Sequence, residues 1–444
     1  MADERLVALS ALEAVEEMAR GAISAEEYTR ACLERIAAVD GDVKAFAHLD
    51  PEYAVAQARE RDEWRQTGRP LGSLHGVPVG IKDIFDTEDY PTECGSPILS
   101  GRRPGRDCTA VARLREAGAV ILGKTVTTEF AYFHPGPTRN PHDPTRTPGG
   151  SSSGSAAAVA AGMLPLAIGS QTNGSVIRPA SFCGVYGLKP THGTISRHGA
   201  LILSRALDHV GVFARTLADA ALMLDVLAGY DAQDGDTRAQ PAGGFLDTAM
   251  EEPPMPPRFA FLPTPVWDKA DAETRAAFES LATSLGERTQ KVEMPGGYAA
   301  AWDDHRVIMA TDMAHNIGPI VERAPDKASA KIRELIAEGS ATTAVRYLQA
   351  RDNAPRYAVG LAEIFKAYDA IITPATIGVA PEGMATGNPL FNSLWSLTGL
   401  PAITLPLLEN EAGLPLGVQL IGERGDDARL LRAANWLDER LGAE

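Results

Sequence analysis

The stretch PGGSSSGSAAAVAAGMLPLAIGSQTNGSVIRPASFCGVYGLKP, from Pro148 to Pro190, organises the interpretation of the whole chain. It contains two Gly/Ser turns, at residues 149–154 and 169–175, with an alanine-rich helical run and the apolar segment 164–168 between them. Because these apolar residues give both turns a core to pack on, we reject a flexible Gly/Ser linker. Two neighbouring glycine-rich turns indicate backbone N–H groups gathered to bind an anion or an oxyanion.

The serines of the two turns are the candidate reactive groups. The phosphate-loop pattern GxxxxGK[ST] is absent from the stretch, which leaves serine chemistry at Ser151 and Ser175. A serine hydroxyl is a weak nucleophile until a neighbouring base takes its proton. The base must therefore come from another part of the chain.

Lys82 is the candidate base. It follows the segment LHGVPVGI, in which Val77, Val79 and Ile81 alternate as in a buried strand. A lysine in this position is either a surface residue whose stem lies on apolar groups or a buried functional amine. The local sequence alone favours the surface position.

The composition argues against several classes of function. The formal net charge is −16 and the pI is about 5.1, which argues against electrostatic binding to nucleic acid or to an anionic membrane. No apolar run reaches the length of a membrane span, and the acidic N-terminus lacks a secretion signal, so we expect a cytoplasmic protein. The cysteines form no CxxC pair and predict free, mostly buried thiols without structural zinc: Cys32, Cys94, Cys108 and Cys183.

Helical and strand patterns alternate along the chain, which predicts an α/β protein. We expect one helix from about Leu6 to Gly21 and another that begins at Ser24 with a capping box. The acidic, Pro/Gly-rich residues 229–257 predict a surface connection. Residues 300–367 predict helices, and their regularly spaced apolar and histidine side chains, His305 among them, predict a core face rather than a metal site.

Three ordered motifs resemble those of the amidase signature family. GVPVGIKD holds Lys82, PGGSSSGSAAAVAAG holds Ser151, and GSQTNGSVIRPASFCGVYGLKP holds Ser175. The similarity continues through SRALDHVGVFARTLADAALMLDVLAG, YDAIITPA, LTGLPAITLP and PLGVQLIG. It covers most of residues 5–440 and is weakest between 230 and 365. One Gly/Ser turn is a weak signal, whereas the ordered set is highly specific.

The resemblance implies a fold and a domain organisation. We expect an α/β protein with the amidase signature fold, a large, mixed, central β-sheet flanked by α-helices on both faces. A single amidase domain would span residues 1–444. Its expected parts are an N-terminal helical scaffold (5–68), the signature core (70–228), a variable, helical, substrate-facing region (268–367) and C-terminal strands with a closing helix (368–441).

The resemblance also implies a Ser–cis-Ser–Lys triad. By position, Ser175 matches the nucleophile, Ser151 the bridging serine that follows a cis peptide bond, and Lys82 the base. An unperturbed lysine has a pKa of about 10.4, so it can act as a base near neutral pH only if burial lowers its pKa. The family's oxyanion hole consists of backbone amides, which correspond here to those of the nucleophile itself and of Thr172, Asn173 and Gly174.

Three departures from the family pattern affect this turn. Many members read GTDTGGS where this chain reads GSQTNGS, so Gln171 replaces an acidic residue and Asn173 replaces a glycine. Asparagine tolerates positive φ better than most residues. Arg178 lies three residues after the matched nucleophile rather than two. It either binds a substrate carboxylate or pairs with a buried carboxylate or carbonyl of the protein.

The expected activity is hydrolysis of a small-molecule amide through an acyl-enzyme on Ser175, without metal or cofactor. Aryl and alkyl amides are the first candidates, and carbamates, urethanes and esters are chemically adjacent because the same acyl transfer accepts another leaving group. We expect loops 94–99 and 134–139 and part of region 300–395, including Trp395, to line the pocket.

The alternative function is the amidase subunit of a glutamyl-tRNA(Gln) amidotransferase, working with partner chains. The GSQTNGS departure, the absence of a basic face and the short chain argue against it. A third hypothesis, an inactive binding protein, conflicts with the intact Lys82, Ser151 and Ser175. A homodimer stays open as the assembly, and the expected partner is a small-molecule amide rather than nucleic acid or membrane.

Overall fold

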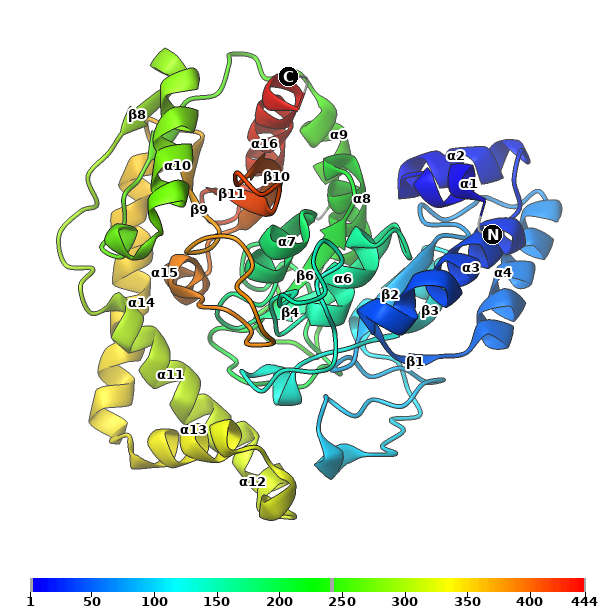
Figure 1. The fold of residues 1–444 in the computed structure, drawn as a ribbon, viewed down its shortest axis with the longest axis horizontal. Coiled ribbons are helices and arrows are strands. Elements are labelled where there is room, and N and C mark those ends of the chain that lie inside the picture. Colours follow the sequence, from blue (N-terminus) through cyan, green and yellow to red (C-terminus); the bar gives the residue numbers. More distant parts are fainter. Residues whose placement is uncertain (1–2, 240–242, 443–444) are drawn as a thin grey trace.

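In the described part of the chain, one mixed sheet of eleven strands runs through the molecule, and the predicted α/β fold is confirmed (Figure 1). The computed structural model describes residues 3–239 and 243–442. The order of strands across the sheet is β1-β3-β2-β4-β6-β5-β10-β11-β9-β7-β8. Their bounds are β1 (Phe46–Leu49), β2 (Pro78–Lys82), β3 (Val120–Thr125), β4 (Leu166–Gln171), β5 (Tyr186–Lys189), β6 (His209–Ala214), β7 (Phe259–Phe261), β8 (Thr289–Lys291), β9 (Ala370–Pro374), β10 (Ala402–Glu409) and β11 (Pro415–Ile421).

The register of β2 and β4 brings two distant motifs to one edge of the sheet. These strands pair in parallel, with Ile81 opposite Ile168. Because parallel strands end at the same edge, Lys82 at the end of β2 lies beside the end of β4, where the second Gly/Ser turn begins. Strand β4 pairs antiparallel with β6 on its other side, which makes the sheet mixed.

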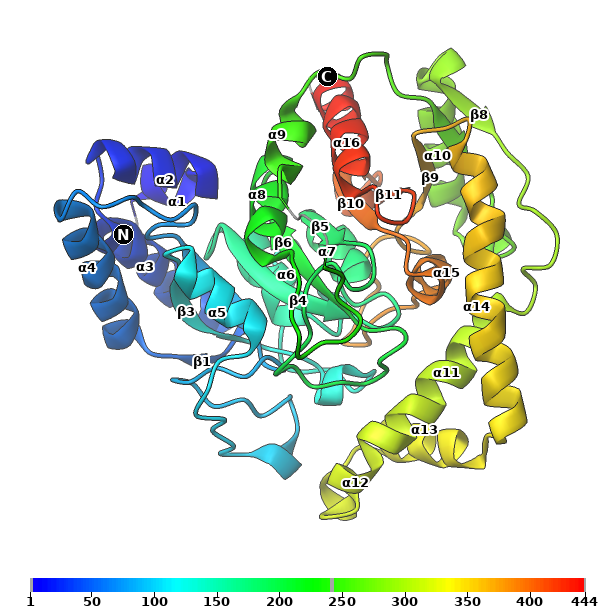
Figure 2. The same cartoon turned by 180° about the vertical axis from the view of Figure 1, so that it is seen from behind.

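Helices cover both faces of this sheet (Figures 1 and 2). Helices α6 and α7 pack on the central strands and on each other, whereas α8 and α16 pack on the central strands from the other face. The bounds are α1 (Glu4–Ala8), α2 (Ala11–Arg20), α3 (Ala25–Val43), α4 (Pro51–Gln66), α5 (Thr109–Glu116), α6 (Ser153–Ala160), α7 (Ile177–Cys183), α8 (Leu217–Leu227), α9 (Phe245–Met250), α10 (Ala272–Ser284), α11 (Ala301–Asn316), α12 (Gly318–Val321), α13 (Ala330–Ala341), α14 (Ala344–Phe365), α15 (Leu390–Thr398) and α16 (Asp427–Leu441). Short 3₁₀ turns are η1 (Pro97–Leu99), η2 (Glu129–Ala131), η3 (Trp267–Lys269), η4 (Gly286–Arg288) and η5 (Pro325–Lys327).

The predicted N-terminal helix is two helices, which corrects the sequence prediction. Ser10 ends the extended link after α1 and caps α2, because its hydroxyl accepts from Glu13 N while the Glu13 carboxylate accepts from Ser10 N. The apolar residues keep their three-residue spacing across the break between α1 and α2, so the sequence pattern gives no sign of it. Gly21 ends α2 with a positive φ, and Ser24 begins α3 with a second capping box, as predicted.

The predicted surface connection 229–257 also needs correction, because it contains helix α9. This helix packs against α8 and α16, and the Asp225 carboxylate accepts from the amides of Phe245 and Leu246 at its start. A helix of six residues is too short to show a helical period. Residues 240–242 of the connection lie outside the described residues.

Helices α11 to α14, residues 301–365, form what we call the helical arm, which lies to one side of the sheet (Figures 1 and 2). It corresponds to the predicted helical region 300–367. Helices α11 and α13 cross closely at Gly339, where a Cβ would overlap the Ala310 carbonyl group. Its contacts with the rest of the fold include α15, which packs against both α11 and α14.

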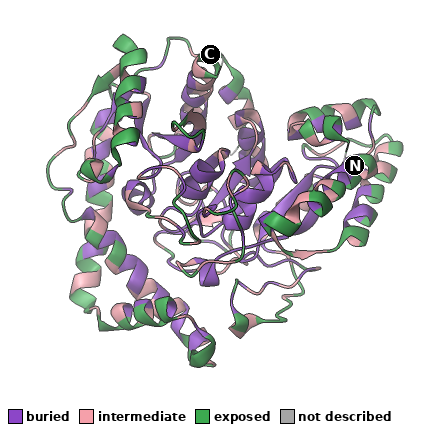
Figure 3. Cartoon of the chain, viewed as in Figure 1, coloured by how far each residue is buried: buried purple, intermediate pink, exposed green. Residues whose placement is uncertain are grey.

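Buried residues concentrate along the sheet and the helix faces against it (Figure 3). The four cysteines are free and buried, as predicted. Across residues 3–239 and 243–442, no helix combines the length and the apolarity needed to cross a lipid bilayer.

Candidate active site

A small cavity of about 10 Å³ lies at the sheet edge where β2 and β4 end. It is lined by Ser151 and Ser175 from the two Gly/Ser turns, and by Arg178. Other lining residues come from segments far apart in the chain: Ala131, Tyr132, Phe133, Thr172, Asn173, Leu203 and Met309. The expected loop 134–139 does not contribute, because the chain reaches the cavity just before it. Trp395 is buried in α15 and is not among the lining residues.

Lys82 is buried, so the surface position favoured by its local sequence is wrong. Its Nζ donates to Ser151 Oγ at 2.7 Å and to Ser170 Oγ at 2.8 Å. Burial lowers the pKa of Lys82 well below its usual value, and the charges of Asp208 and Cys94 oppose this shift only in part. Burial therefore favours the neutral, basic form of this amine.

Ser151 is held in its loop by the backbone around it. The Gly150–Ser151 peptide bond is cis. The Ser151 carbonyl accepts from Thr128 N at 3.1 Å. Gly149 has a φ of +81°, and a Cβ there would lie 2.9 Å from Pro179 Cα, so only glycine fits. These contacts fix the Ser151 hydroxyl beside Lys82.

Ser175 shares the cavity with Ser151, but no hydrogen bond joins the two hydroxyls. Within the described residues the Ser175 hydroxyl has no hydrogen-bond partner. The backbone N–H groups of residues 172–175 likewise have no acceptor among the described residues. Four donors and one hydroxyl of a single turn are thus available to a bound molecule.

Helix α15 supports the turn from behind. Ser393 Oγ donates to Asn173 Oδ1 at 2.7 Å, and Ser396 Oγ donates to the Asn173 carbonyl at 2.6 Å. A Cβ on Gly174 would overlap Asn392 Oδ1. Sequence reasoning missed these α15 residues, since they belong to no motif and act only through tertiary contact.

Gln171, the neutral replacement for an acidic residue, is buried and hydrogen-bonded at both ends. Its Oε1 accepts from Val176 N at 2.9 Å and from Ile177 N at 3.0 Å. Its Nε2 donates to Ser396 Oγ at 3.1 Å. The amide therefore holds the residues that follow Ser175 without adding a negative charge near Lys82.

Asp208 and His305 hold Thr172 at the start of the turn. The Asp208 carboxylate accepts from Thr172 Oγ1 at 2.6 Å and from the amides of Leu203 and Ser204. Burial raises the pKa of Asp208 to about 6. His305 Nε2 lies 3.0 Å from the Thr172 carbonyl, and burial lowers its pKa to about 4, so the neutral ring donates from Nε2. The core face predicted for His305 therefore also contacts the turn.

Arg178 is buried in α7 and only partly paired. Its Nη2 donates to the Gly150 carbonyl at 2.6 Å, whereas Nε and Nη1 have no hydrogen-bond partner in the described part of the chain. Burial lowers the pKa of Arg178 to about 9, which leaves it protonated at neutral pH. Its guanidinium lies 5.6 Å from the ring centroid of Phe133. No described carboxylate forms an ion pair with it. The cavity is thus lined by a positive charge that lacks a counter-ion.

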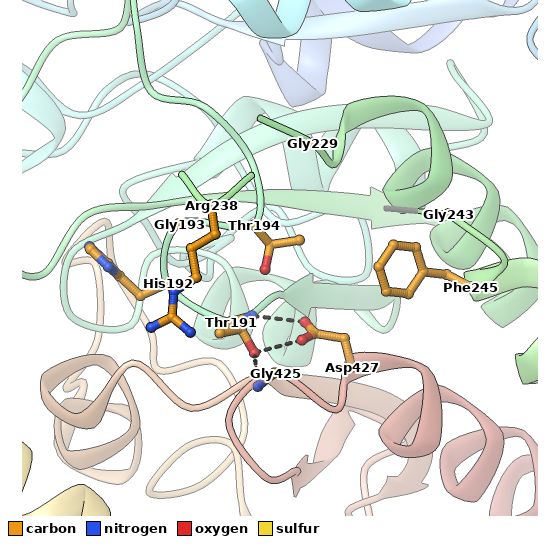
Figure 4. A pocket seen from close by; sticks show the side chains of 10 residues that line it. All are labelled: Thr191, His192, Gly193, Thr194, Gly229, Arg238, Gly243, Phe245, Gly425 and Asp427. Carbon is orange, nitrogen blue, oxygen red and sulfur yellow. Dashed lines mark hydrogen bonds between the residues drawn. The ribbon is translucent and has the colours of Figure 1, made fainter. Parts of the chain in front are cut away.

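A separate cavity of about 190 Å³ lies near the end of β5 (Figure 4). There the Asp427 carboxylate accepts from both the backbone N and the hydroxyl of Thr191. Its described lining residues include neither a lysine nor a serine, so it does not compete as a reaction site. Among the described residues, no group of three His, Cys, Asp or Glu side chains is arranged to hold a metal ion.

Comparison with known proteins gives consistent matches over almost the whole chain. The family described as Amidase matches residues 27–431. The chain is 36% identical to the A subunit of the glutamyl-tRNA(Gln) amidotransferase of Chloroflexus aurantiacus, covering 94% of this chain and 93% of that protein.

Solved structures are similar as well, among them two that cover almost the whole chain. One was described as an unexpected vestigial protein complex that reveals the origins of an s-triazine catabolic enzyme; its TM-score is 0.91 at 32% identity, covering 97% of this chain and 98% of that one. The other is the peptide amidase of Stenotrophomonas maltophilia, with a TM-score of 0.86 at 31% identity, covering 98% of this chain and 97% of that one.

Proposed function

Because this chain belongs to the amidase family and is an amide C–N hydrolase, we propose that it acts through an acyl-enzyme on Ser175, with Ser151 and Lys82 as proton carriers. The observation that carries the proposal is the buried amine of Lys82, 2.7 Å from the Ser151 hydroxyl, in a position where its pKa is lowered. A neutral lysine is the base that an unactivated serine needs.

In the proposed acylation, Ser175 Oγ attacks the amide carbonyl carbon. Its proton passes to Ser151 Oγ while the proton of Ser151 passes to Lys82 Nζ. The tetrahedral intermediate collapses when the C–N bond breaks, and the same proton returns through Ser151 to the leaving nitrogen. A water molecule then attacks the ester carbonyl carbon and gives its proton through Ser151 to Lys82. The acid leaves when the bond to Ser175 Oγ breaks, and the proton returns through Ser151 to Ser175. Ser170 accepts a second hydrogen bond from Lys82 Nζ and so holds the amine beside Ser151; the neutral amine would turn its lone pair to Ser151 when it takes the proton.

The negative charge on the attacked oxygen would be stabilised by the amides of Thr172, Asn173, Gly174 and Ser175. Their lack of acceptors among the described residues supports this role. The hydrogen bonds from α15 hold the turn rigid before substrate arrives, which is the condition for such stabilisation.

We propose that Arg178 binds an anionic or strongly polar group close to the scissile amide. Its two unpartnered nitrogens and missing counter-ion support this. The sequence left two roles open for this residue. Nη2 serves the structural role at the Gly150 carbonyl, and the buried Nε and Nη1, which have no partner among the described residues, would serve the substrate.

The test is a hydrolysis screen of purified protein with EDTA present. It compares anilides, aliphatic amides, carbamates and p-nitrophenyl esters in wild type, Ser175→Ala and Lys82→Ala. Turnover that both variants lose supports the mechanism, and the rank order identifies the leaving group. If the wild-type protein hydrolyses none of these compounds and takes up no fluorophosphonate, the proposal of a stand-alone hydrolase is wrong.

A second candidate is the glutaminase component of an amidotransferase. The similarity to the Chloroflexus aurantiacus amidotransferase chain favours it over a stand-alone hydrolase, whereas the similarity to the Stenotrophomonas maltophilia peptide amidase favours the hydrolase. In this candidate the same Ser175 chemistry releases ammonia from glutamine for use by partner chains. A glutaminase assay with and without candidate partner chains separates the two, because an amidotransferase component gains activity on assembly.

The continuous sheet supports the proposal that the chain forms a single domain. Four buried free thiols fit a reducing compartment, so we retain the cytoplasm as the proposed location.

A further inference from the structure

A larger cavity of about 520 Å³ lies next to the reaction cavity and has no role in the proposed chemistry. Its walls come from the loop that follows β2, from residues 199–202 and from the junction of α11 and α12. Part of this lining, Cys94 and Leu99, belongs to a loop that the sequence predicted for the substrate pocket. The volume suits an organic ligand of moderate size.

Only a short segment separates the two cavities. Ile202 lines the larger cavity and Leu203 lines the reaction cavity. Helix α11 likewise contributes Met309 to the reaction cavity and Asn316 to the larger one. Asn316 Nδ2 donates to the Leu203 carbonyl at 3.0 Å, which ties the helix to this segment. A molecule bound at Ser175 thus has the larger cavity as its neighbour.

The charges around this cavity do not balance. Arg102 donates to both oxygens of Asp86, at 2.7 and 3.1 Å, so this pair is neutral. Arg106 and Arg323 stand at the exposed rim of this cavity, and neither guanidinium has a hydrogen bond or an ion pair with any described residue. In a chain of net charge −16, these two arginines give the rim of this cavity a local excess of positive charge.

The remainder of the lining is largely apolar. Ile84, Leu99, Ile202 and Ile320 contribute aliphatic surface. A ligand that suits both features has an apolar chain and an anionic end, because guanidinium groups bind carboxylates in paired hydrogen bonds.

We propose that this cavity binds the far end of the substrate, a carboxylate separated by an aliphatic spacer from the amide that Ser175 attacks. The inference rests on the proposed function and deepens it by naming the substrate class, ω-amides of longer dicarboxylic acids. Arg178 then serves groups near the amide, and Arg106 and Arg323 serve the remote carboxylate.

The test measures binding by isothermal titration calorimetry to the Ser175→Ala protein, so that turnover does not interfere. The probes are the monoamides of succinic, adipic and suberic acids and their neutral counterparts butanamide, hexanamide and octanamide. We expect one of the longer monoamides to bind about tenfold more tightly than its neutral counterpart. Adding Arg106→Glu and Arg323→Glu should abolish that preference. Arg103→Glu, an exposed arginine of the same loop outside this cavity, is the matched control and should retain it.

The inference is overturned if the longer monoamides bind no better than the neutral amides, or if their preference survives both charge reversals. The hydrolysis screen reports separately on the reaction. Charge-dependent binding without any wild-type turnover would remove the proposed reaction and leave the anion site. Turnover without charge-dependent binding would keep the proposed reaction and remove the anion site.

Discussion

Lys82 Nζ lies 2.7 Å from Ser151 Oγ, although 69 positions separate the two residues in the chain. The parallel pairing of β2 with β4 produces this contact, because it brings the end of the lysine strand to the Gly/Ser turns. Within residues 3–239 and 243–442, the hydrogen-bond partners of the buried amine are two hydroxyl groups, those of Ser151 and Ser170. Neither partner is charged, so nothing at hydrogen-bond distance restores its usual pKa.

Removal of either member of this pair should abolish most of the activity. We expect Lys82→Met and Ser151→Ala to lower kcat about 10²–10⁴-fold, the range of a general base. Melting temperatures should not fall in Lys82→Met, because it removes a buried amine and keeps the volume filled. Steady-state kinetics and circular dichroism check both. Ser153→Ala is the control, since that hydroxyl makes only a 3.4 Å hydrogen bond to the Val126 carbonyl; a similar loss there would contradict the assignment.

The pH dependence should report the lowered pKa of Lys82. Only the neutral amine accepts a proton, so kcat/KM should rise with pH through that pKa, well below the ordinary lysine range. Asp208 raises the pKa of Lys82 by its charge, so Asp208→Asn should move the rising limb to lower pH. The asparagine retains an acceptor for the Leu203 and Ser204 amides and donates to Thr172. A limb that stays in place, or moves to higher pH, contradicts this coupling.

Asp208 should also affect stability. Its folded-state pKa of about 6 lies above the usual value of 3.8. The contribution of Asp208 to the free energy of unfolding is therefore fully present below pH 3.8 and is lost as the pH rises through about 6. We expect Asp208→Asn to flatten the fall of the free energy of unfolding over this window, measured by urea titration at several pH values. An unchanged slope would show that other groups dominate.

The support of the turn by α15 predicts a sharp steric effect at Gly174. A methyl group there would overlap Asn392 Oδ1 and displace the amides proposed for the oxyanion hole. We expect Gly174→Ala to lower kcat about 10²–10³-fold, the cost of losing one such donor. Gly296→Ala is the matched control, because nothing lies within 4 Å of a Cβ at that position. Equal kinetics in the two variants would mean that the turn is not preorganised.

Much of this site could be predicted from the sequence, because Ser151 and Ser175 stand in glycine-rich turns whose order along the chain is specific. The environment of Lys82 could not, since its burial depends on strands that pair with β2 from elsewhere in the chain. Ser396 and Asp208 also escaped prediction. Ser396 stands in an apolar helix, and Asp208 stands in the family-like segment SRALDHVG without a sign of its contact with Thr172, so only tertiary contact reveals their roles.

Arg178 carries a buried charge that has no counter-ion among the described residues. A carboxylate held close to the scissile amide should pair with its free nitrogens and stabilise the folded protein. We expect succinic acid monoamide to raise the melting temperature of Ser175→Ala and butanamide to raise it less. Adding Arg178→Met should remove the difference, whereas adding Arg106→Glu and Arg323→Glu should retain it, because those arginines line the neighbouring cavity. If Arg178→Met leaves the difference intact, Arg178 only holds the Gly150 carbonyl, and the selectivity for groups near the amide comes from other residues of the cavity.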